Sequence, residues 1–585
     1  MSNNRNIPGR VPGAAVTFTV KIDGNQIPRS YEVYAVTVIK AANRIPQAKV
    51  TLIDGEPAKE SFAASNDSLF LPGAAIEIYA GHQSQEDCIY KGIIVKHGIS
   101  VRKNGSSQLK LDCRDIAMRM TLGRKAAIYT EVKDTDVATQ LFGNYNVSIA
   151  EKEETTYKHA ELVQYDCSDW DFILERMDVN GKLVIVNDGA VSVKAPSFKP
   201  DPVLTLQYGA TILEFTAEMD ARTQLAGVKA TGWSPADQQL LEVDAQAPAG
   251  IKEPGNVASS KLADVTGLPE LVLRHGGNLT REELQAWANT AWQKSMLAKI
   301  CGTVMFDGFA GIKPGDLVQL QGMGDRFNGK HFVSGIRHDI SNGGWTTTAQ
   351  LGMDKEWYAQ QIACSERIAA SSLLPQIHGL QTGIVTRLKK DPLGEDRVQV
   401  KIPTINASDG LWARIATLDA GKDSGTFFRP DIDDEVIVGF ISNDPRQAVI
   451  LGMLNSSRKP APVAATDENK EKGFYSDSKM KVVFQEEDKS ILIETPGGNS
   501  MLLSEKDKGI TIQDQNGNKL VMNQDGIALQ TAKKLSFNSS GGDVETAGLN
   551  IKHAAKSQFK AEGTTGIELS SSAVAKLKGS LVQIN

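Results

Sequence analysis

The last hundred residues show a short repeat in which two apolar residues flank a single intervening residue. Between Lys481 and Asn585 these pairs recur, with steps of seven or eight residues from Leu520 to Leu535 and longer steps elsewhere. Residues i and i+2 share one face of a strand, so each pair predicts a short strand with one apolar face. Gly, Asn, Asp, Ser and Lys lie between the pairs and favour turns. The pairs are Ile510/Ile512, Leu520/Met522, Ile527/Leu529, Leu535/Phe537, Leu549/Ile551, Ile567/Leu569 and Val582/Ile584.

Two apolar side chains per strand are too few to build a core within one chain. A repeat of this kind must stack on itself or on further copies of the chain. A β-helix of three intertwined chains fits the pattern best, because it buries one thin apolar stripe from each chain. The pattern therefore predicts a stiff needle, whose core is made by the pairs from Ile510/Ile512 to Ile567/Leu569.

The chain before this repeat is also rich in predicted strands. Residues 14–115 contain short runs of alternating or β-branched residues separated by turn sequences. Strands this short and this closely spaced favour a barrel. Residues 302–351 show the same pattern and predict a second barrel. Five further strands between residues 381 and 455 have the size of a small closed barrel of the OB type.

A few helices interrupt these strands. Ser168 is followed three residues later by an acid, and Thr280 and Glu283 form a capping box, so both positions predict a helix start. Residues 236–262 are polar and rich in Ala, Pro and Gly, and we expect a loop or hinge there. Helices are predicted at 136–142, 168–177, 281–300 and about 354–371.

Composition predicts a sufficient core and argues against several classes of protein. At 585 residues and 63.2 kDa the chain is several domains long, and 41% of its residues are hydrophobic. The net charge of −6 argues against nucleic acid as a partner. No apolar signal segment opens the chain, and no apolar run approaches the roughly 20 residues that cross a bilayer. Five scattered cysteines indicate a reducing compartment, so we expect a protein made in the cytoplasm.

Motifs that resemble catalytic or metal sites have better structural interpretations. Residues 324–331 match a phosphate-binding loop, except that His331 replaces the Ser or Thr that holds Mg²⁺, and predicted strands flank both sides. A hairpin turn is therefore expected there. Residues 513–517 lack the acidic spacing of a calcium loop and predict a turn, and the acidic cluster at 431–435 predicts a solvated loop. We expect no catalytic, cofactor-binding or metal-binding residues, although scattered acids leave a glycosidase pair open.

A family resemblance is carried by an ordered series of residues in the third β unit. The series resembles the OB domain of VgrG-like spike proteins, which occur in type VI secretion systems, extracellular contractile injection systems and contractile phage tails. Residues 164–176 and 311–316 resemble the phage-hub-like segment of the same family. The series comprises Gly383-Ile384-Val385, Asp391-Pro392, Gly394, Arg397-Val398, Val400, Ile402-Pro403, Leu411-Trp412-Ala413-Arg414, Arg429-Pro430, Asp434-Glu435-Val436, Asp444-Pro445 and Gly452.

This resemblance implies a mainly β homotrimer with four parts. Residues 1–375 would form a phage-hub-like domain of two β-barrels with inserted helices, 376–456 an OB-fold domain, 457–480 a linker and 481–585 an intertwined trimeric β-helix. It also implies the function of a central spike. The trimer would cap the inner tube of a contractile particle, adapt the sixfold tube to the threefold needle, and pierce the target envelope when the sheath contracts.

The same resemblance implies the partners. Inner tube and baseplate proteins would contact the hub, effectors are a further class of partner, and the target membrane would be met only during puncture. A PAAR-type tip protein would bind the end of the needle. An alternative interpretation is a tail-associated enzyme that degrades polysaccharide or peptidoglycan on a β-helical trimer. The thin needle and its few aromatic residues argue against that alternative. The expected tip-binding residues are Leu581, Val582, Gln583, Ile584 and Asn585.

Overall fold

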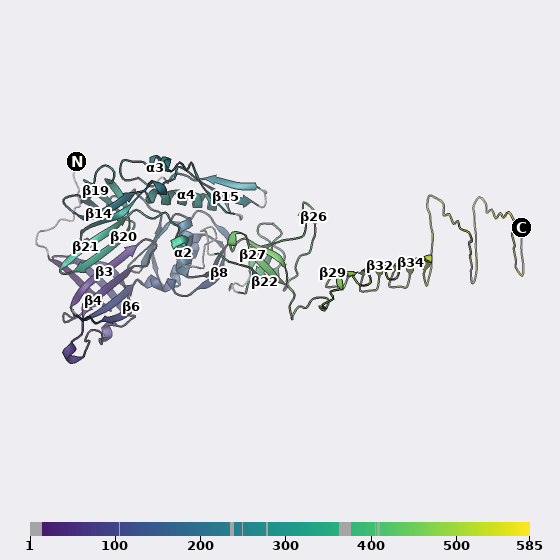
Figure 1. Ribbon diagram of the computed structural model, residues 1–585, viewed down its shortest axis with the longest axis horizontal. Helices are drawn as coiled ribbons and strands as arrows, with labels where there is room; N and C mark the ends of the chain where they lie inside the picture. Colours follow the sequence, from purple (N-terminus) through teal and green to yellow (C-terminus); the bar gives the residue numbers. More distant parts are fainter. Residues whose placement is uncertain are drawn as a thin grey trace. The chain divides into compact units, whose positions relative to one another are not determined.

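The chain folds into two compact units, Met1–Asn455 and Ser456–Asn585, and strands are the main regular element in each (Figure 1). The predicted mainly β class is confirmed. We refer to residues 15–361 as the hub segment, to residues 376–453 as the OB barrel and to residues 471–530 as the needle sheet. The computed structural model describes residues 15–103, 106–234, 239–248, 250–275, 279–361, 376–403, 405 and 410–584.

One large sheet in the hub segment joins the two regions that the sequence predicts as barrels. Among the described residues it has thirteen strands, in the order β14-β18-β21-β20-β3-β4-β7-β6-β5-β1-β2, with β19 on β20 and β13 on β19. The antiparallel pair β20–β3 links the two regions. The strands are β1 Val16–Ile22, β2 Asn25–Gln26, β3 Val33–Ala41, β4 Gln47–Ile53, β5 Ala75–His82, β6 Gln85–Ser100, β7 Gln108–Arg114, β13 Leu204–Gln207, β14 Ile212–Met219, β18 Ile300–Asp307, β19 Leu317–Gln321, β20 Gly329–Ser341 and β21 Gly344–Leu351.

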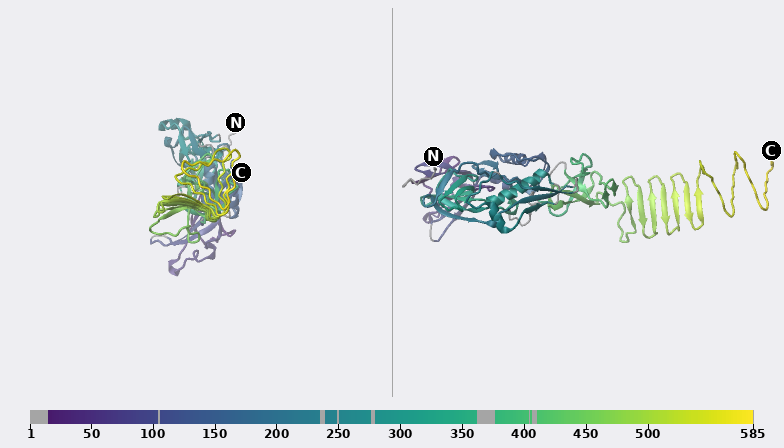
Figure 2. Two further views of the ribbon diagram at one scale, coloured as in Figure 1. Left: turned by 90° about the vertical axis from the view of Figure 1, so that its right-hand side faces the viewer. Right: turned by 90° about the horizontal axis from the view of Figure 1, so that it is seen from above.

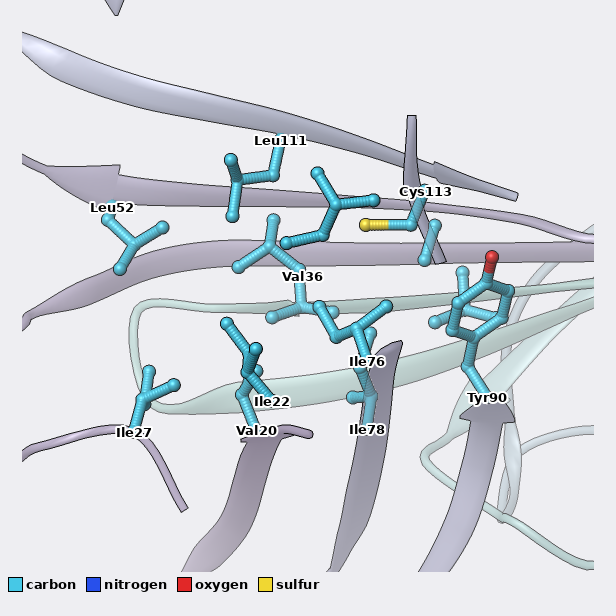
Figure 3. Close-up of a cluster of buried hydrophobic side chains, with 14 of the residues drawn as sticks. Val20, Ile22, Ile27, Val36, Leu52, Ile76, Ile78, Tyr90, Leu111 and Cys113 are labelled. Atoms are coloured by element: carbon cyan, nitrogen blue, oxygen red, sulfur yellow. The ribbon is translucent and has the colours of Figure 1, made fainter. Parts of the chain in front are cut away.

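Each of these two regions packs its own apolar core against the shared sheet. From Val36 in β3 and from Ala48 in β4, every second side chain is buried, as the period-two pattern requires. Figure 3 shows Val36 and Leu52 facing Ile22 across the interior of the first region, and all three are almost completely buried. A second cluster surrounds Val304 and Phe306 in the other region. The two predicted barrels therefore correspond to two cores on one continuous sheet.

Helices and small sheets complete the hub segment. The predicted helices at 136–142 and 168–177 are present as α1 and α2. The Ser168 hydroxyl accepts a hydrogen bond from the Asp171 N–H at 3.1 Å, and the Thr280 hydroxyl accepts one from the Glu283 N–H at 3.1 Å. The elements are β8 Lys125–Val132, α1 Asp134–Gly143, β9 Ser148–Lys152, β10 His159–Cys167, α2 Asp169–Val179, β11 Leu183–Asn187, β12 Ala190–Lys194, β15 Val228–Ser234, β16 Gln239–Asp244, α3 Ser259–Thr266, β17 Leu271–Arg274, α4 Arg281–Leu297 and α5 Tyr358–Gln361.

Removing the cap of α4 should destabilise the hub segment. Thr280→Ala deletes the hydroxyl that satisfies the Glu283 N–H, and loss of such a cap costs about 1 kcal/mol. The free energy of opening, measured by hydrogen exchange on peptides from α4, should fall by that amount. The exposed Thr130 on β8 serves as the matched control, because Thr130→Ala removes a hydroxyl that caps no helix. An unchanged opening energy in Thr280→Ala would contradict the assigned cap.

The structure corrects the predicted loop at 236–262. Strand β16 lies within it and pairs with β15 from Lys229/Asp244 to Ser234/Gln239, and α3 begins at Ser259. The polar composition masked an apolar alternation, because the buried Val243 packs into the cluster around α4. The predicted helix at 354–371 is represented by the short α5, and its residues 362–371 lie outside the described residues.

The OB barrel is a closed five-stranded barrel, which confirms the predicted fold of this unit. Its order is β22-β23-β24-β28-β27, and β24 and β28 are its parallel pair. Side chains such as Val385, Val400 and Val438 fill its interior and are fully buried. The strands are β22 Gln381–Arg387, β23 Val398–Lys401, β24 Leu411–Ile415, β27 Glu435–Phe440 and β28 Ala448–Met453, with a small hairpin of β25 Ala420–Gly421 and β26 Ser424–Gly425.

The needle sheet is a meander of seven short antiparallel strands, visible as a ladder in the right-hand view of Figure 2. Strand β29 lies inside the predicted linker 457–480 and corrects it. Phe474 of β29 pairs with Val482, so the apolar alternation begins earlier than its charged surroundings suggest. Among the described residues after Gln530 no strand forms. The strands are β29 Glu471–Tyr475, β30 Lys481–Gln485, β31 Ser490–Glu494, β32 Ser500–Ser504, β33 Gly509–Gln513, β34 Lys519–Asn523 and β35 Gly526–Gln530.

Candidate functional site

Two columns of apolar side chains run across one face of the needle sheet. The register places Ile512 opposite Met501 on one neighbouring strand and opposite Leu520 on the other. Side chains two apart on a strand share a face, so the pairs of successive strands fall into line. One column is Phe474, Val482, Ile493, Met501, Ile512, Leu520 and Leu529, and the other is Phe484, Ile491, Leu503, Ile510, Met522 and Ile527.

This apolar face is unpartnered in a single chain. The exposed fraction is 40% for Ile512 and 73% for Ile527, although both lie within paired strands. A hollow of about 610 Å³ lies over this face and is lined by apolar side chains that include Ile493 and Leu520. Covering a large aliphatic side chain stabilises an assembly by roughly 1.5–3 kcal/mol. The face is therefore suited to pack against other apolar chains.

The first half of the predicted needle core lies together in the two columns. These residues occupy three successive strands, β33 to β35, and their side chains share one face of the needle sheet. None of them is fully buried in a single chain, because no other segment that the structure describes covers that face. The residues are Ile510, Ile512, Leu520, Met522, Ile527 and Leu529.

The second half of the predicted core forms no strand in a single chain, which corrects the expectation of a regular strand at each apolar pair. A strand requires a hydrogen-bonded neighbour, and longer polar segments such as 538–548 separate these pairs along the chain. Their side chains are therefore exposed, and their burial stays a prediction for the trimer. They are Leu535 (50% exposed), Phe537 (67%), Leu549 (99%), Ile551 (49%), Ile567 (56%) and Leu569 (84%).

The expected tip-binding residues lie at the end of the chain. Leu581, Val582, Gln583 and Ile584 are exposed, and Asn585 lies outside the described residues. Exposed apolar side chains at this position are available to a partner. The tip-binding role of these last residues stays a prediction.

A second feature is a network of buried charges where the OB barrel meets the hub segment. Arg446 of the barrel donates to both carboxylate oxygens of Glu283 on α4, at 2.8 and 3.0 Å, and to Asp444 at 2.9 and 3.1 Å. Arg176 on α2 lies 3.4 Å from the same Glu283 and donates to Asp134 at 2.7 Å. All five side chains are almost fully buried. The network thus ties the barrel to three helices of the hub segment, α1, α2 and α4.

Histidines extend this network at both ends. His159 Nε2 lies 3.1 Å from Asp134, and His275 Nε2 lies 3.3 Å from Asp444. Burial alone would raise the pKa of Asp444, but attraction to Arg446 outweighs it and holds that pKa well below its usual range. Burial would likewise raise the pKa of Glu283, but attraction to Arg446 opposes it, and the pKa of Glu283 is also lowered. These carboxylates therefore stay ionised at the contact between the OB barrel and the hub segment.

This network was not predicted from the sequence, although the sequence contains one signal of it. Arg176 shares its helix face with Phe172 and Ile173, and Glu283 shares its face with Trp287. A charged residue within an apolar helix stripe indicates a buried partner. Glu283 was expected to complete the capping box of α4. Its carboxylate binds Arg446 instead, because a buried guanidinium offers two charge-assisted hydrogen bonds.

The motifs that resemble catalytic or metal sites occupy structural positions. Residues 322–328 connect the paired strands β19 and β20, which confirms a strand-to-strand turn in place of a phosphate loop. Residues 514–518 form the turn between β33 and β34. Over the described ranges, no group of three or more His, Cys, Asp or Glu is placed to hold a metal ion. Within the same ranges, no helix is long and apolar enough to span a membrane.

Three family models match consecutive parts of the chain. Residues 12–342 match the Alg8 N-terminal domain, which covers more than half of the chain. Residues 381–454 match the type VI secretion system/phage-baseplate injector OB domain. Residues 490–545 match the phage baseplate V C-terminal trimerisation domain, and this range includes most of the two apolar columns.

Individual relatives agree with these matches. The type VI secretion system spike protein VgrG1a of Pseudomonas aeruginosa is 27% identical over 166 residues, which cover 26% of either chain. VgrG3 of Vibrio cholerae is 31% identical over 105 residues, 16% of this chain and 10% of the relative. The chain thus spans about a quarter or less of these relatives.

The fold is also similar to a solved structure. The Francisella PdpA-VgrG complex in its half-lidded form aligns with 91% of this chain and 89% of that chain, at a TM-score of 0.54 and 9% identity. That similarity concerns the fold alone. The three matched domains, in their order along the chain, define the family. The chain belongs to the Alg8 N-terminal domain family and is a VgrG-like spike protein.

Proposed function

We propose that this chain is the central spike of a contractile injection machine and acts as a homotrimer. Three needle sheets bury their apolar faces against one another. The three hub segments cap the inner tube, contact baseplate proteins and adapt the sixfold tube to the threefold needle. When the sheath contracts, the needle pierces the target envelope. The spike is made in the bacterial cytoplasm, assembled into the particle, and reaches the exterior or the target cell on firing.

One observation carries this proposal. The side chains of the two apolar columns are exposed or only half-buried in a single chain, and most of them lie in the segment that matches a trimerisation domain. A sheet with an uncovered apolar face is unstable in water unless further chains cover it. Closure by neighbouring chains also leaves few free strand edges, which suits a stiff needle.

The role in the particle is tested by deleting the gene and restoring it. We expect particles without this chain to lack a tube that ends in a spike, as seen by electron microscopy, and the restored chain to return it. Particles with an unchanged spike would contradict the proposal. The enzyme alternative is tested on purified protein with polysaccharide and peptidoglycan substrates. We expect no hydrolysis, because the proposed role transmits force and requires no catalytic residue.

Binding of the tip gives a separate prediction. Residues 578–585 are proposed to seat a PAAR-type tip protein, because Leu581, Val582 and Ile584 among them present exposed apolar side chains. Deleting them should abolish capture of the tip protein in a pull-down and leave the molar mass of the trimer unchanged. The control replaces the non-terminal residues 570–577 with a Gly/Ser sequence of equal length and should retain capture. Capture by the deleted chain would place the tip elsewhere.

A further inference from the structure

A small cavity lies at the contact between the hub segment and the OB barrel. Its volume is about 170 Å³, and it is lined by β10 and the start of α4 on one side and by the barrel strands on the other. Beside it, Val163 of β10 packs against Ile402 and Leu411 of the barrel. The cavity therefore belongs to the surface on which the barrel is docked.

Glu161 of β10 places its carboxyl group in this cavity. The backbone N–H of Trp412 in the barrel donates a hydrogen bond to that carboxyl group. The second oxygen, Oε1, is buried and has no hydrogen-bond partner among the described residues. An ionised carboxylate with an unpaired buried oxygen is unfavourable, whereas a neutral carboxyl group is tolerated.

Three cations of the cavity wall, Lys158, Arg397 and Arg446, are already engaged with other carboxylates. Arg446 binds Glu283 and Asp444, and Arg397 donates to Asp391 at 2.7 and 2.9 Å. Lys158 Nζ lies 3.1 Å from Glu131, and Arg414 is exposed at the mouth of the cavity. The remaining titratable groups in the wall are His159, Glu283 and Glu395.

We propose that Glu161 makes docking of the OB barrel on the hub segment proton-dependent. The contact is firm when the carboxyl group is protonated and loosens when it ionises. Arginine partners lower the pKa of Glu283, Asp444 and Asp391, so these neighbouring carboxylates stay ionised while the charge of Glu161 changes. The proposal concerns a contact within one chain and does not depend on the proposed function.

Burial raises the pKa of Glu161 to about 7, although the hydrogen bond from Trp412 and the charge of Arg397 each lower that pKa in part. The raised pKa supports this assignment. A carboxyl group whose folded pKa is raised stabilises the docked state fully below its ordinary pKa. That stabilisation is lost as pH rises through the folded value. Opening of the contact should therefore become about 10- to 100-fold more frequent between pH 5 and pH 8.5.

Hydrogen exchange of the full-length chain tests the proposal. Peptides from β10 and β24 report the contact, and a peptide from β4 in the first hub core serves as reference. Each exchange rate is divided by the intrinsic rate at that pH. We expect the wild-type contact to open about 10- to 100-fold more often at pH 8.5 than at pH 5, while β4 stays constant.

Two substitutions separate Glu161 from its neighbours. Glu161→Gln and Glu161→Ala should both give a flat pH profile for the contact. Glu395→Gln changes another carboxyl group in the same cavity wall and should retain the wild-type profile. A flat wild-type profile, or a rise that persists in both Glu161 variants, would overturn the proposal. Loss of the rise in Glu395→Gln would assign the proton to Glu395 instead.

Discussion

Ile512→Asp is expected to convert the trimer into single chains. Ile512 lies in the middle of one apolar column, between Met501 and Leu520 of the neighbouring strands. Each trimer would bury three carboxylates along its axis, at several kcal/mol per ion, and would lose the apolar contact of the isoleucines as well. Every 1.4 kcal/mol weakens association about tenfold. The combined cost is therefore expected to exceed the binding free energy of this thin interface.

The neighbouring residue supplies the matched control for this variant. Thr511 lies on the same strand β33, but its side chain points to the opposite face of the needle sheet. Thr511→Asp adds the same charge without placing it in the apolar columns, and it should retain the trimer. Light scattering distinguishes the two states by molar mass. A full-mass trimer from Ile512→Asp would show that the other face of the sheet turns inward.

Arg446→Met is expected to weaken the joint between the OB barrel and the hub segment most severely. The substitution leaves the buried carboxylates of Glu283 and Asp444 without their main cation, and breaking such a pair costs about 3–5 kcal/mol. Arg176 and His275 remain near these carboxylates, so the lower end of this range applies. The free energy of opening, measured by hydrogen exchange in β24, should fall accordingly.

A surface pair and a pH series complete this test. Arg222 pairs with Asp220 but its side chain is 88% exposed, so Arg222→Met should change little. In the wild type the lowered pKa values of Glu283 and Asp444 give a stabilisation that is present above their ordinary pKa, near 4. It is lost as pH falls through the folded values. In Arg446→Met the unpaired carboxylates take up protons at higher pH, so the deficit should be largest near pH 7 and smaller at about pH 4. A deficit that does not depend on pH would point to lost packing.

Much of the fold could be predicted because local patterns carry it. The strands Leu411–Ile415 and Glu435–Phe440 occur where alternation predicts them, and Ser168 caps α2 as its spacing to an acid suggests. The pairs in 510–529 share one face because a period of two fixes the face of every strand residue. These features depend on neighbours in sequence.

Features that depend on distant partners could not be predicted. The pairing of β20 with β3 joins residues about 300 positions apart and fuses two predicted barrels into one sheet. Strand β16 was not predicted because the segment around it is polar. The strand forms because it pairs with β15. The charge network joins Asp134, Arg176, Glu283, Asp444 and Arg446 from separate elements. Its one local sign was the position of Arg176 and Glu283 within apolar helix stripes.

The apolar pairs after Gln530 are another case in which the local sequence pattern did not predict the structure. Phe537 and Ile551 have the alternation of a strand residue, yet each lies in a segment with no paired neighbour and stays exposed. Alternation fixes the face that a side chain would occupy, but pairing depends on a second segment within hydrogen-bonding reach. A local pattern therefore could not predict where the regular strands of the needle sheet end.

The molar mass of the purified full-length chain, measured by light scattering, tests the central claim most directly. The needle sheet exposes an apolar face that only further copies of the chain can cover in the proposed way. Three chains of 63.2 kDa should therefore give a particle of about 190 kDa that persists on dilution. A stable, folded monomer of 63.2 kDa would contradict the trimeric needle and, with it, the proposed spike.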